Sequence, residues 1–244
     1  AVEVTKLSLL LKVLEGENEE SINAQLKLFH ERALPNLSSN IKCGNSLIGP
    51  DFYAQHEMQL LDEEERLRIN VFDWRAAFPR VFSAADAGFS AIIGNPPYVR
   101  IQVMKEWAAQ EVEHYKKAYA SAGKGNYDIY VVFVEKGLQL LKNDGLLGYI
   151  LPHKFFNAQY GEPLRRVIAD GKHLEQVIHF GDQQVFKGVT TYTCLLFLNK
   201  SGSDTCAVTK VTDLEQWQID SSTGTTGAIK ADRITACEWN FNVG

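Results

Sequence analysis

The chain has 244 residues, of which 45% are hydrophobic and 23% are charged, a composition that fits one large or two small globular domains. Disorder, a collagen-like repeat and a small disulfide-stabilised fold are therefore excluded. The 25 basic and 30 acidic residues give a formal net charge of -5. Any contact with nucleic acid must then be made by a local basic surface, because the chain as a whole repels phosphate.

The first predicted element is a helix at the very start of the chain. Leu7, Leu10, Leu11 and Leu14 recur at helical spacing, with no capping residue or initiator Met before them. This pattern suggests that the chain begins inside a helix and is a piece of a larger polypeptide, with a charged loop following at residues 16–21. Farther on, the stretch Glu57–Arg68 is so rich in charge that it predicts a solvated helix.

Membrane and redox signals point to a location in a reducing compartment. The apolar run at residues 7–14 is too short to span a membrane, which takes about 20 apolar residues, and no secretory signal is present. The four cysteines show neither Cys-x-x-Cys spacing nor nearby histidine pairs. We therefore expect a cytoplasmic protein that has no membrane contact, no metal site and no disulfide framework.

Short apolar runs then alternate with helix-like stretches, which is typical of an open parallel sheet covered by helices. A helix capped by Asp128 is expected to run to Leu141 and to end in a turn at residues 142–145, and a second helix fits Glu162–Asp170. The expected strands are Phe89–Ile93, Leu146–Leu151, Leu174–Phe180 and Tyr192–Leu198.

The alternation weakens beyond Leu198, and the polar stretch Ser221–Gly227 predicts a flexible segment. These two observations place a domain boundary near residue 200.

The most informative stretch runs from Ile92 to Val99. An apolar strand ends in Asn95-Pro96-Pro97-Tyr98, where two prolines fix the backbone in an extended loop. Open α/β sheets bind ligands at the carboxyl ends of their strands. The Asn95 amide oxygen and the Pro96 carbonyl can both accept hydrogen bonds from an amino group, and the Tyr98 ring can stack on the ring that bears it. The alternative is a plain diproline turn in which Tyr98 only packs.

Asn-Pro-Pro-Tyr is also the catalytic motif of S-adenosylmethionine-dependent methyltransferases that modify amino groups. The chain resembles the adenine-specific DNA methyltransferases of type IIG restriction-modification enzymes, the TaqI-like gamma class. Four further stretches, in the family's order, support this resemblance over roughly residues 1 to 200: Ile41–Ile48, Asp128–Tyr130 with Glu135–Gly137, Gly148–Phe155 and Phe186–Tyr192.

The resemblance implies a Rossmann-like class I methyltransferase fold that is incomplete at the N-terminus. Family members carry a glycine-rich loop and an acidic residue ahead of the region that matches this chain, and together these hold the cofactor. We therefore expect residues 1–200 to be the C-terminal portion of the catalytic domain and residues 201–244 to be a connector toward a target-recognition domain. By itself the chain should be inactive and should bind S-adenosylmethionine weakly or not at all, which calorimetry can test.

The resemblance also implies roles for individual residues. The amine of a flipped adenine would be held by Asn95 and the Pro96 carbonyl, and its ring would stack on Tyr98. The expected catalytic residues are Asn95, Pro96, Pro97 and Tyr98, and the expected cofactor-binding residues are Asn45, Asp128 and Tyr130. For Asp128 the alternative is the helix cap described above.

The substrate contacts are less closely defined by the motifs. Tyr160, Phe155 and Phe156 compete to clamp the other face of the base, and Tyr160 is favoured because it lies beside Gly161 in a polar loop. Lys154 is placed to meet a DNA phosphate. A wider set of basic residues supports DNA binding, with helix solvation as the alternative reading: Arg100, Lys105, Lys116, Lys117, Lys124, Lys154, Arg165 and Arg166.

The expected function is transfer of a methyl group from S-adenosylmethionine to the N6 amine of adenine in double-stranded DNA, within a type II restriction-modification system. Expected partners are the rest of the parent polypeptide and a second copy of the chain, joined through the edge of the strand before Asn95. No nuclease signature follows Pro50-Asp51. The alternatives are a methyltransferase acting on ribosomal RNA or a protein glutamine, and an inert DNA-positioning module.

Overall fold

The computed structural model describes residues 2–14, 37–55, 62–186, 188 and 191–241. These form two compact units, Ala1–Ala77 and Phe78–Gly244. The expected loop at residues 16–21 lies outside the described residues, and so does the first part of the helix expected at residues 57–68.

The first unit contains the helix expected at the start of the chain, which runs as α1 from Val2 to Leu14. The charged helix is also confirmed over the part that is described. It begins after Asp62, whose carboxylate accepts a hydrogen bond from the backbone N–H of Glu65 at 2.7 Å. The elements of this unit after α1 are a 3-10 helix Leu37–Ser39, α3 Asp51–Gln55, α4 Glu63–Ile69 and α5 Trp74–Ala77.

The second unit is built on one six-stranded sheet with the order β1-β2-β4-β3-β5-β6. Its strands are β1 Phe89–Gly94, β2 Leu141–Pro152, β3 Leu174–His179, β4 Thr193–Asn199, β5 Thr205–Lys210 and β6 Thr225–Lys230. The pairs β1·β2 and β3·β5 are parallel, whereas β4 is antiparallel to both β2 and β3 and β6 is antiparallel to β5. Thus β1, β2, β3 and β5 all point the same way. The α/β architecture expected from the sequence is confirmed, but the sheet is mixed rather than parallel as expected, because β4 and β6 run antiparallel to their neighbours.

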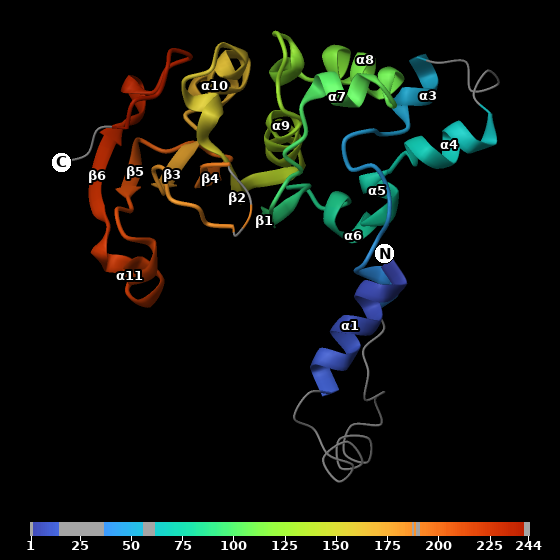
Figure 1. The fold of residues 1–244 in the computed structure, drawn as a ribbon. Helices are drawn as coiled ribbons and strands as arrows, with labels where there is room; N and C mark the ends of the chain where they lie inside the picture. The colour runs from blue at the N-terminus through green and yellow to red at the C-terminus, as the bar shows by residue number, and fades with distance from the viewer. Residues whose placement is uncertain (1, 15–36, 56–61, 187, 189–190, 242–244) are drawn as a thin grey trace. The chain divides into compact units, whose positions relative to one another are not determined.

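Helices connect and cover these strands. Figure 1 shows α9 and α10 next to each other on one side of the sheet, and the two helices are in contact. The helices are α6 Pro79–Phe82, α7 Ile101–Lys105, α8 Ala109–Ala118, α9 Tyr130–Leu140, α10 Glu162–Asp170 and α11 Leu214–Ile219, with 3-10 helices at Ala120–Ala122, His153–Phe156, Gln159–Gly161, Ser221–Thr223 and Ala231–Arg233.

The four expected strands are confirmed, but β2 is longer than expected. It starts at Leu141, so the turn expected at residues 142–145 is part of the strand, because Leu141 pairs with Phe89 of β1. The prediction of a flexible segment at residues 221–227 is wrong, because these residues form a 3-10 turn and the start of β6. Both β5 and β6 extend the same sheet past residue 200, where we expected a change of domain. The functional division at that point stays a prediction.

Helix α9 supplies much of the core that supports the sheet. Val131, Val134 and Leu138 are almost completely buried, and each such side chain contributes on the order of 1.5–3 kcal/mol. Gly137 lets the helix approach β2 closely, because a Cβ atom there would lie 2.3 Å from a methyl carbon of Leu147. The position of α9, and of the loop that precedes it, is therefore fixed by contact with the sheet.

The parallel strands β1, β2 and β3 have their carboxyl ends at the same edge of the sheet. The start of β4 lies there too, because Thr193 pairs with Pro152 and Cys194 pairs with His179. Segments that follow β1 and β2 and precede β4 consequently meet at this edge. Open α/β sheets bind their ligands at this kind of edge.

Candidate active site at the carboxyl edge of the sheet

The Asn-Pro-Pro-Tyr loop begins directly after β1, as expected. Asn95 is exposed, whereas Pro96 is buried and Pro97 is exposed. The buried proline anchors the loop, and the carboxamide before it stays open to solvent. The motif as a whole is therefore not packed away in the interior, and the Asn95 carboxamide is available to a ligand.

Tyr98 is held in a fixed orientation. Its hydroxyl donates a hydrogen bond to the Ile150 carbonyl of β2 at 3.1 Å, and its ring meets Tyr130 edge-on with the centroids 6.3 Å apart. Burial raises the pKa of Tyr98 to about 12, so the phenol stays neutral and keeps its role as a donor at physiological pH. A ring held at both its hydroxyl and its edge is a suitable surface for stacking.

The backbone after the motif is fixed by the segment that precedes α9. The Ile129 N–H donates to the Val99 carbonyl and the Ile101 N–H donates to the Tyr127 carbonyl, both at 2.9 Å. An isolated antiparallel bridge joins Arg100 to Asp128 between these bonds. The motif loop and the start of α9, which are 30 residues apart in sequence, thus form one paired unit.

Asp128 does not cap α9, contrary to one expectation. The N-cap of this helix is Ile129, with no side-chain hydrogen bond. The Asp128 carboxylate instead accepts a hydrogen bond from the Tyr160 hydroxyl at 3.2 Å, and that hydroxyl also lies 2.9 Å from the Tyr130 hydroxyl. The chain of Asp128, Tyr160 and Tyr130 ties the loop before α10 to the base of the motif.

A pocket of about 610 Å³ lies beside these groups. It contains four residues singled out from the sequence, namely Tyr98, Arg100, Asp128 and Lys154. Sequence reasoning did not single out the other lining residues, although most fall in or beside stretches that resemble the methyltransferase family. The pocket is lined by Tyr98, Arg100, Asp128, Pro152, His153, Lys154, Asn157, Ala158, Thr191 and Tyr192.

The remaining expected residues lie elsewhere. Tyr130 and Phe155 are fully buried, so their rings are not at the pocket surface. Tyr160 is half-buried and turns its hydroxyl toward Asp128, and it is not a lining residue of the pocket. Asn45 belongs to the first unit, where its side-chain oxygen accepts a hydrogen bond from the Leu47 N–H at 3.2 Å.

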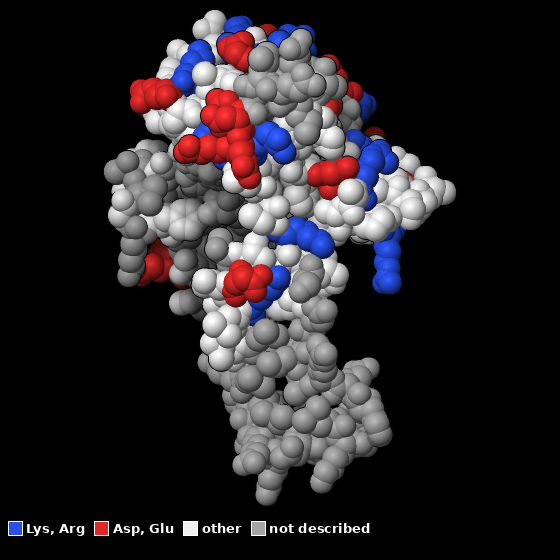
Figure 2. Space-filling view, turned by 90° about the vertical axis from the view of Figure 1, so that its right-hand side faces the viewer, with Lys and Arg blue, Asp and Glu red and all other residues white. Residues whose placement is uncertain are grey.

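Most of the basic residues considered for DNA binding are exposed, but Arg165 is buried, with 3% of its surface accessible. Its donors are engaged by backbone carbonyls, so a phosphate contact by this residue is not supported. Lys116 pairs with Glu113, as expected for helix solvation. On the face shown in Figure 2, the described basic and acidic residues are interspersed and form no continuous basic band.

His153 at the pocket wall and His179 of β3 have their ring centroids 4.3 Å apart. His153 lines the pocket, and the backbone N–H of Gly181 donates to Nδ1 of His179. Burial, reinforced by His153 and Lys210, lowers the pKa of His179 to about 4, and burial also lowers the pKa of His153. Both rings are therefore neutral at pH 7.

We expect these histidines to make the fold less stable in acid. A histidine whose pKa is lower in the folded state makes its full contribution to the free energy of unfolding above its unfolded pKa of about 6.5. That contribution to stability is lost as the pH falls toward 4. The melting temperature should therefore decrease as the pH is lowered from 6.5 to 4. His179→Gln should make the melting temperature depend less on pH in this range. Thermal unfolding at several pH values checks it, and an unchanged slope in the variant would contradict the prediction.

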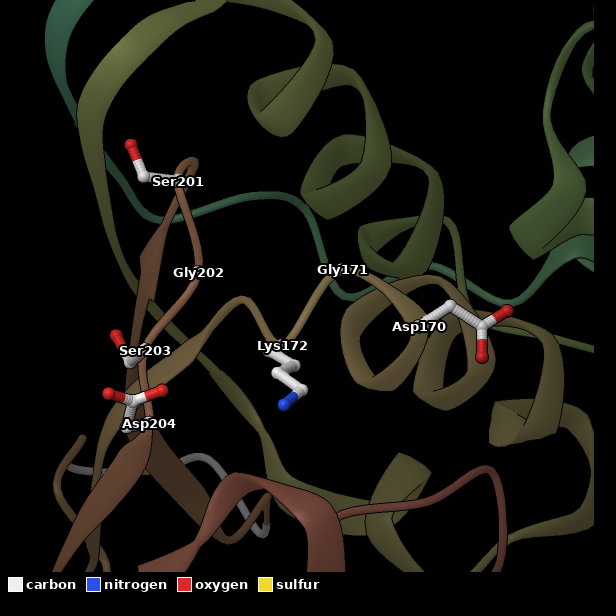
Figure 3. Close-up of a pocket in the computed structure, with 7 residues that line it drawn as sticks. All are labelled: Asp170, Gly171, Lys172, Ser201, Gly202, Ser203 and Asp204. Carbon is white, nitrogen blue, oxygen red and sulfur yellow. The ribbon is translucent and has the colours of Figure 1, made fainter.

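A second hollow of about 300 Å³ lies at the opposite edge, between the turn before β3 and the turn after β4. Figure 3 shows its lining residues, in which Lys172 is the one basic side chain. That ammonium group pairs with Asp232 at 2.9 Å. The one basic group of the hollow is therefore already paired, and the hollow is remote along the strands from the Asn-Pro-Pro-Tyr loop.

Comparison with known proteins places these features in context. The sequence model of the family described as Eco57I restriction-modification methylase matches residues 1–186. The chain is 37% identical over 238 residues to the type II restriction enzyme and methyltransferase RM.Eco57I of Escherichia coli, covering 95% of this chain and 22% of that protein. It is 29% identical over 124 residues to the type II methyltransferase M.BstVI of Geobacillus stearothermophilus, covering 50% of this chain and 21% of that protein. The chain spans about a fifth of the length of these relatives.

Two solved structures are similar to parts of this chain. A putative class I S-adenosylmethionine-dependent methyltransferase from Listeria monocytogenes has a TM-score of 0.46 and 14% identity over 86% of this chain and 78% of that one. The DrdV–DNA complex has a TM-score of 0.47 and 16% identity over 70% of this chain and 19% of that one. Within the described part of this chain, no helix is both long and apolar enough to cross a membrane.

Proposed function

Because the chain belongs to the Eco57I restriction-modification methylase family, we propose that it carries the substrate-binding part of a DNA methyltransferase that modifies the N6 amine of adenine. The proposal rests on one observation, which is the exposure and orientation of the residues in the Asn-Pro-Pro-Tyr loop. Asn95 is exposed directly after β1, and Tyr98 is held by Ile150 at the wall of a pocket. An acceptor for an amine and a face for a planar ring are thus presented together.

The residues act on the base in distinct ways. Asn95 and the Pro96 carbonyl accept hydrogen bonds from the amino group, and these bonds strengthen as the nitrogen becomes positive during transfer. Tyr98 stacks on the ring of a base that has left the helix. Pro97 limits the motion of the loop, so the acceptors keep their spacing as the amine is positioned.

S-adenosylmethionine, when bound, supplies the activated methyl group. Within the second unit the residues fit this cofactor in part, because Asp128 offers a carboxylate at the pocket. Tyr130 is buried, so in our proposal it supports Asp128 through Tyr160 rather than touching the cofactor. The amide of Asn45 can pair with the amine of an adenine ring, as the resemblance implies.

Double-stranded DNA is the proposed substrate, and the rest of a longer polypeptide is the proposed partner. Lys154 and Arg100 line the pocket and can meet the phosphates on either side of the extruded nucleotide. The wider surface carries charges of both signs, and the net charge is -5. We therefore propose that DNA binding is local to the pocket rim and depends on the other parts of the enzyme for its sequence choice.

The proposal is tested with the full-length protein and labelled S-adenosylmethionine. Duplex DNA should take up the label, and digestion to nucleosides should recover it as N6-methyladenine. Ribosomal RNA and a glutamine-containing peptide are offered in parallel reactions. Label found only in RNA or peptide, or as a methylated cytosine, would overturn the assignment, and no transfer to any substrate would favour a DNA-positioning module.

A further inference from the structure

Arg165 of α10 is an unusual core residue. Its side chain is 3% exposed, and none of the ion pairs among the described residues includes it. Its guanidinium group instead donates to three backbone carbonyls, those of Phe155 at 2.5 Å, Ala158 at 2.9 Å and Ala236 at 3.0 Å. A buried cation is costly unless its donors are satisfied, so this arrangement must be well fixed.

The three carbonyls belong to two segments that are about 80 residues apart in sequence. Phe155 and Ala158 lie in residues 153–158, which we call the pocket loop because four of its residues line the candidate pocket: His153, Lys154, Asn157 and Ala158. Ala236 lies in residues 234–241, which we call the terminal segment. Arg165 thus joins the wall of the pocket to the terminal segment through one planar group.

Trp239 makes the same connection from the terminal segment. Its backbone N–H donates to the Phe156 carbonyl at 3.0 Å, and its ring is 5% exposed against Phe155 and Phe156, with centroids 5.8 and 5.6 Å away. The indole N–H is satisfied within the terminal segment by Thr235 at 2.7 Å. The terminal segment therefore holds the pocket loop at two adjacent residues, Phe155 and Phe156, through apolar contact and a hydrogen bond.

Gly161 makes room for the guanidinium group. A Cβ atom at this position would lie 2.1 Å from the Phe155 carbonyl oxygen and 2.8 Å from a terminal nitrogen of Arg165. No other residue allows the pocket loop and the start of α10 to approach so closely. The local backbone is thus shaped around Arg165.

We propose that Arg165 is a positioning residue that fixes the pocket loop against the terminal segment, so that the geometry of the pocket depends on how that segment is held. The role in catalysis rests on the proposed function, whereas the mechanical connection does not. Movement of the terminal segment would shift the carbonyls that Arg165 binds and, with them, Lys154 and His153 at the pocket wall. A displacement of about 1 Å at such a site can cost on the order of 100-fold in rate.

The test uses the full-length protein with Arg165→Gln, Arg165→Lys and Trp239→Leu, and with Arg233→Gln as the matched control. Arg233 lies just before the terminal segment, but it is exposed and belongs to none of the sets considered for DNA binding. Two quantities are measured: amide hydrogen exchange along the chain, and kcat and KM for methyl transfer to DNA.

Arg165→Gln should raise exchange about 10-fold or more in residues 154–161, where the amides of Asn157, Ala158 and Gly161 are bonded within the loop. Exchange in β4 should stay within about twofold, and kcat should fall about 10- to 100-fold. Arg165→Lys should give effects between those of Arg165→Gln and the unchanged protein, and Arg233→Gln should match the unchanged protein. Trp239→Leu should raise exchange in the same residues, and the double variant should be far from additive.

Unchanged exchange in residues 154–161, or exchange that rises equally throughout the chain, would overturn the proposal, as would additive effects of the two substitutions. If Arg165→Gln does not fold, Arg165→Lys and Trp239→Leu decide the matter. If the unchanged enzyme transfers no methyl group to DNA, the proposed function fails, but the exchange measurement still decides whether Arg165 positions the loop.

Discussion

Replacing Asn95 by alanine is expected to reduce methyl transfer by the full-length enzyme about 100- to 1000-fold, the cost of removing one group that stabilises charge in a transition state. The carboxamide is exposed, so its removal leaves no cavity in the core. Stability should therefore change by less than about 0.5 kcal/mol, as for other surface substitutions. The rate constant and the unfolding midpoint are measured on the same preparation.

The matched control is Asn143→Ala, which removes an exposed carboxamide near the opposite edge of the sheet. This variant should keep full activity. Asn95→Asp retains an acceptor oxygen but adds a charge, so it should lose less activity than the alanine variant. If Asn95→Ala keeps more than a tenth of the normal rate, the amide does not hold the amine and the proposed role of the motif is wrong.

Phe155→Ala should destabilise the second unit by about 3–5 kcal/mol, the usual cost of truncating a fully buried aromatic side chain. Its ring is completely buried and meets the rings of Tyr130, Phe156 and Trp239. The lost stability includes both the transfer free energy of the removed atoms and the cost of the cavity that remains. Unfolding in urea, followed by circular dichroism, measures it.

Phe155→Leu is the control, since it keeps most of the buried volume, and it should cost clearly less than the alanine variant. The comparison also decides between two roles for Phe155. A base-contacting ring would give weaker DNA binding with a loss of stability below about 1 kcal/mol. That result would contradict the core position and restore Phe155 as a substrate contact.

The strands nearest the candidate site were predictable because their apolar residues are continuous and their ends are marked by proline or polar residues. Phe89–Gly94 and Thr193–Asn199 differ from the expected ranges by only one residue at either end. The strand Thr225–Lys230 was not predictable, since its threonines and glycine resemble a flexible segment. It forms because each residue pairs with one in β5, a contact made by residues about 20 positions away.

The site itself was predictable only where a single local stretch carries the chemistry. The diproline loop is such a stretch, and its position after β1 follows from sequence. The role of Asp128 was not predictable, because its partner Tyr160 is 32 residues away and a local helix cap was equally consistent with the pattern. Arg165 resembled a surface cation for the same reason, since the carbonyls that engage it are set by tertiary folding.

The antiparallel pairing of β2 with β4 limits how this region can change in evolution. Pro152 and Thr193 face each other at one rung, with His153 and Tyr192 just beyond it. Deleting one residue inside β4 would invert the facing of every side chain on one side of the deletion, and so would misplace Tyr192 or disturb the core. Lengthening the connection between β3 and β4 within residues 181–186 would leave the pairing of Pro152 with Thr193 intact. Natural variants should therefore gain and lose residues in that connection and keep the length of β4 constant.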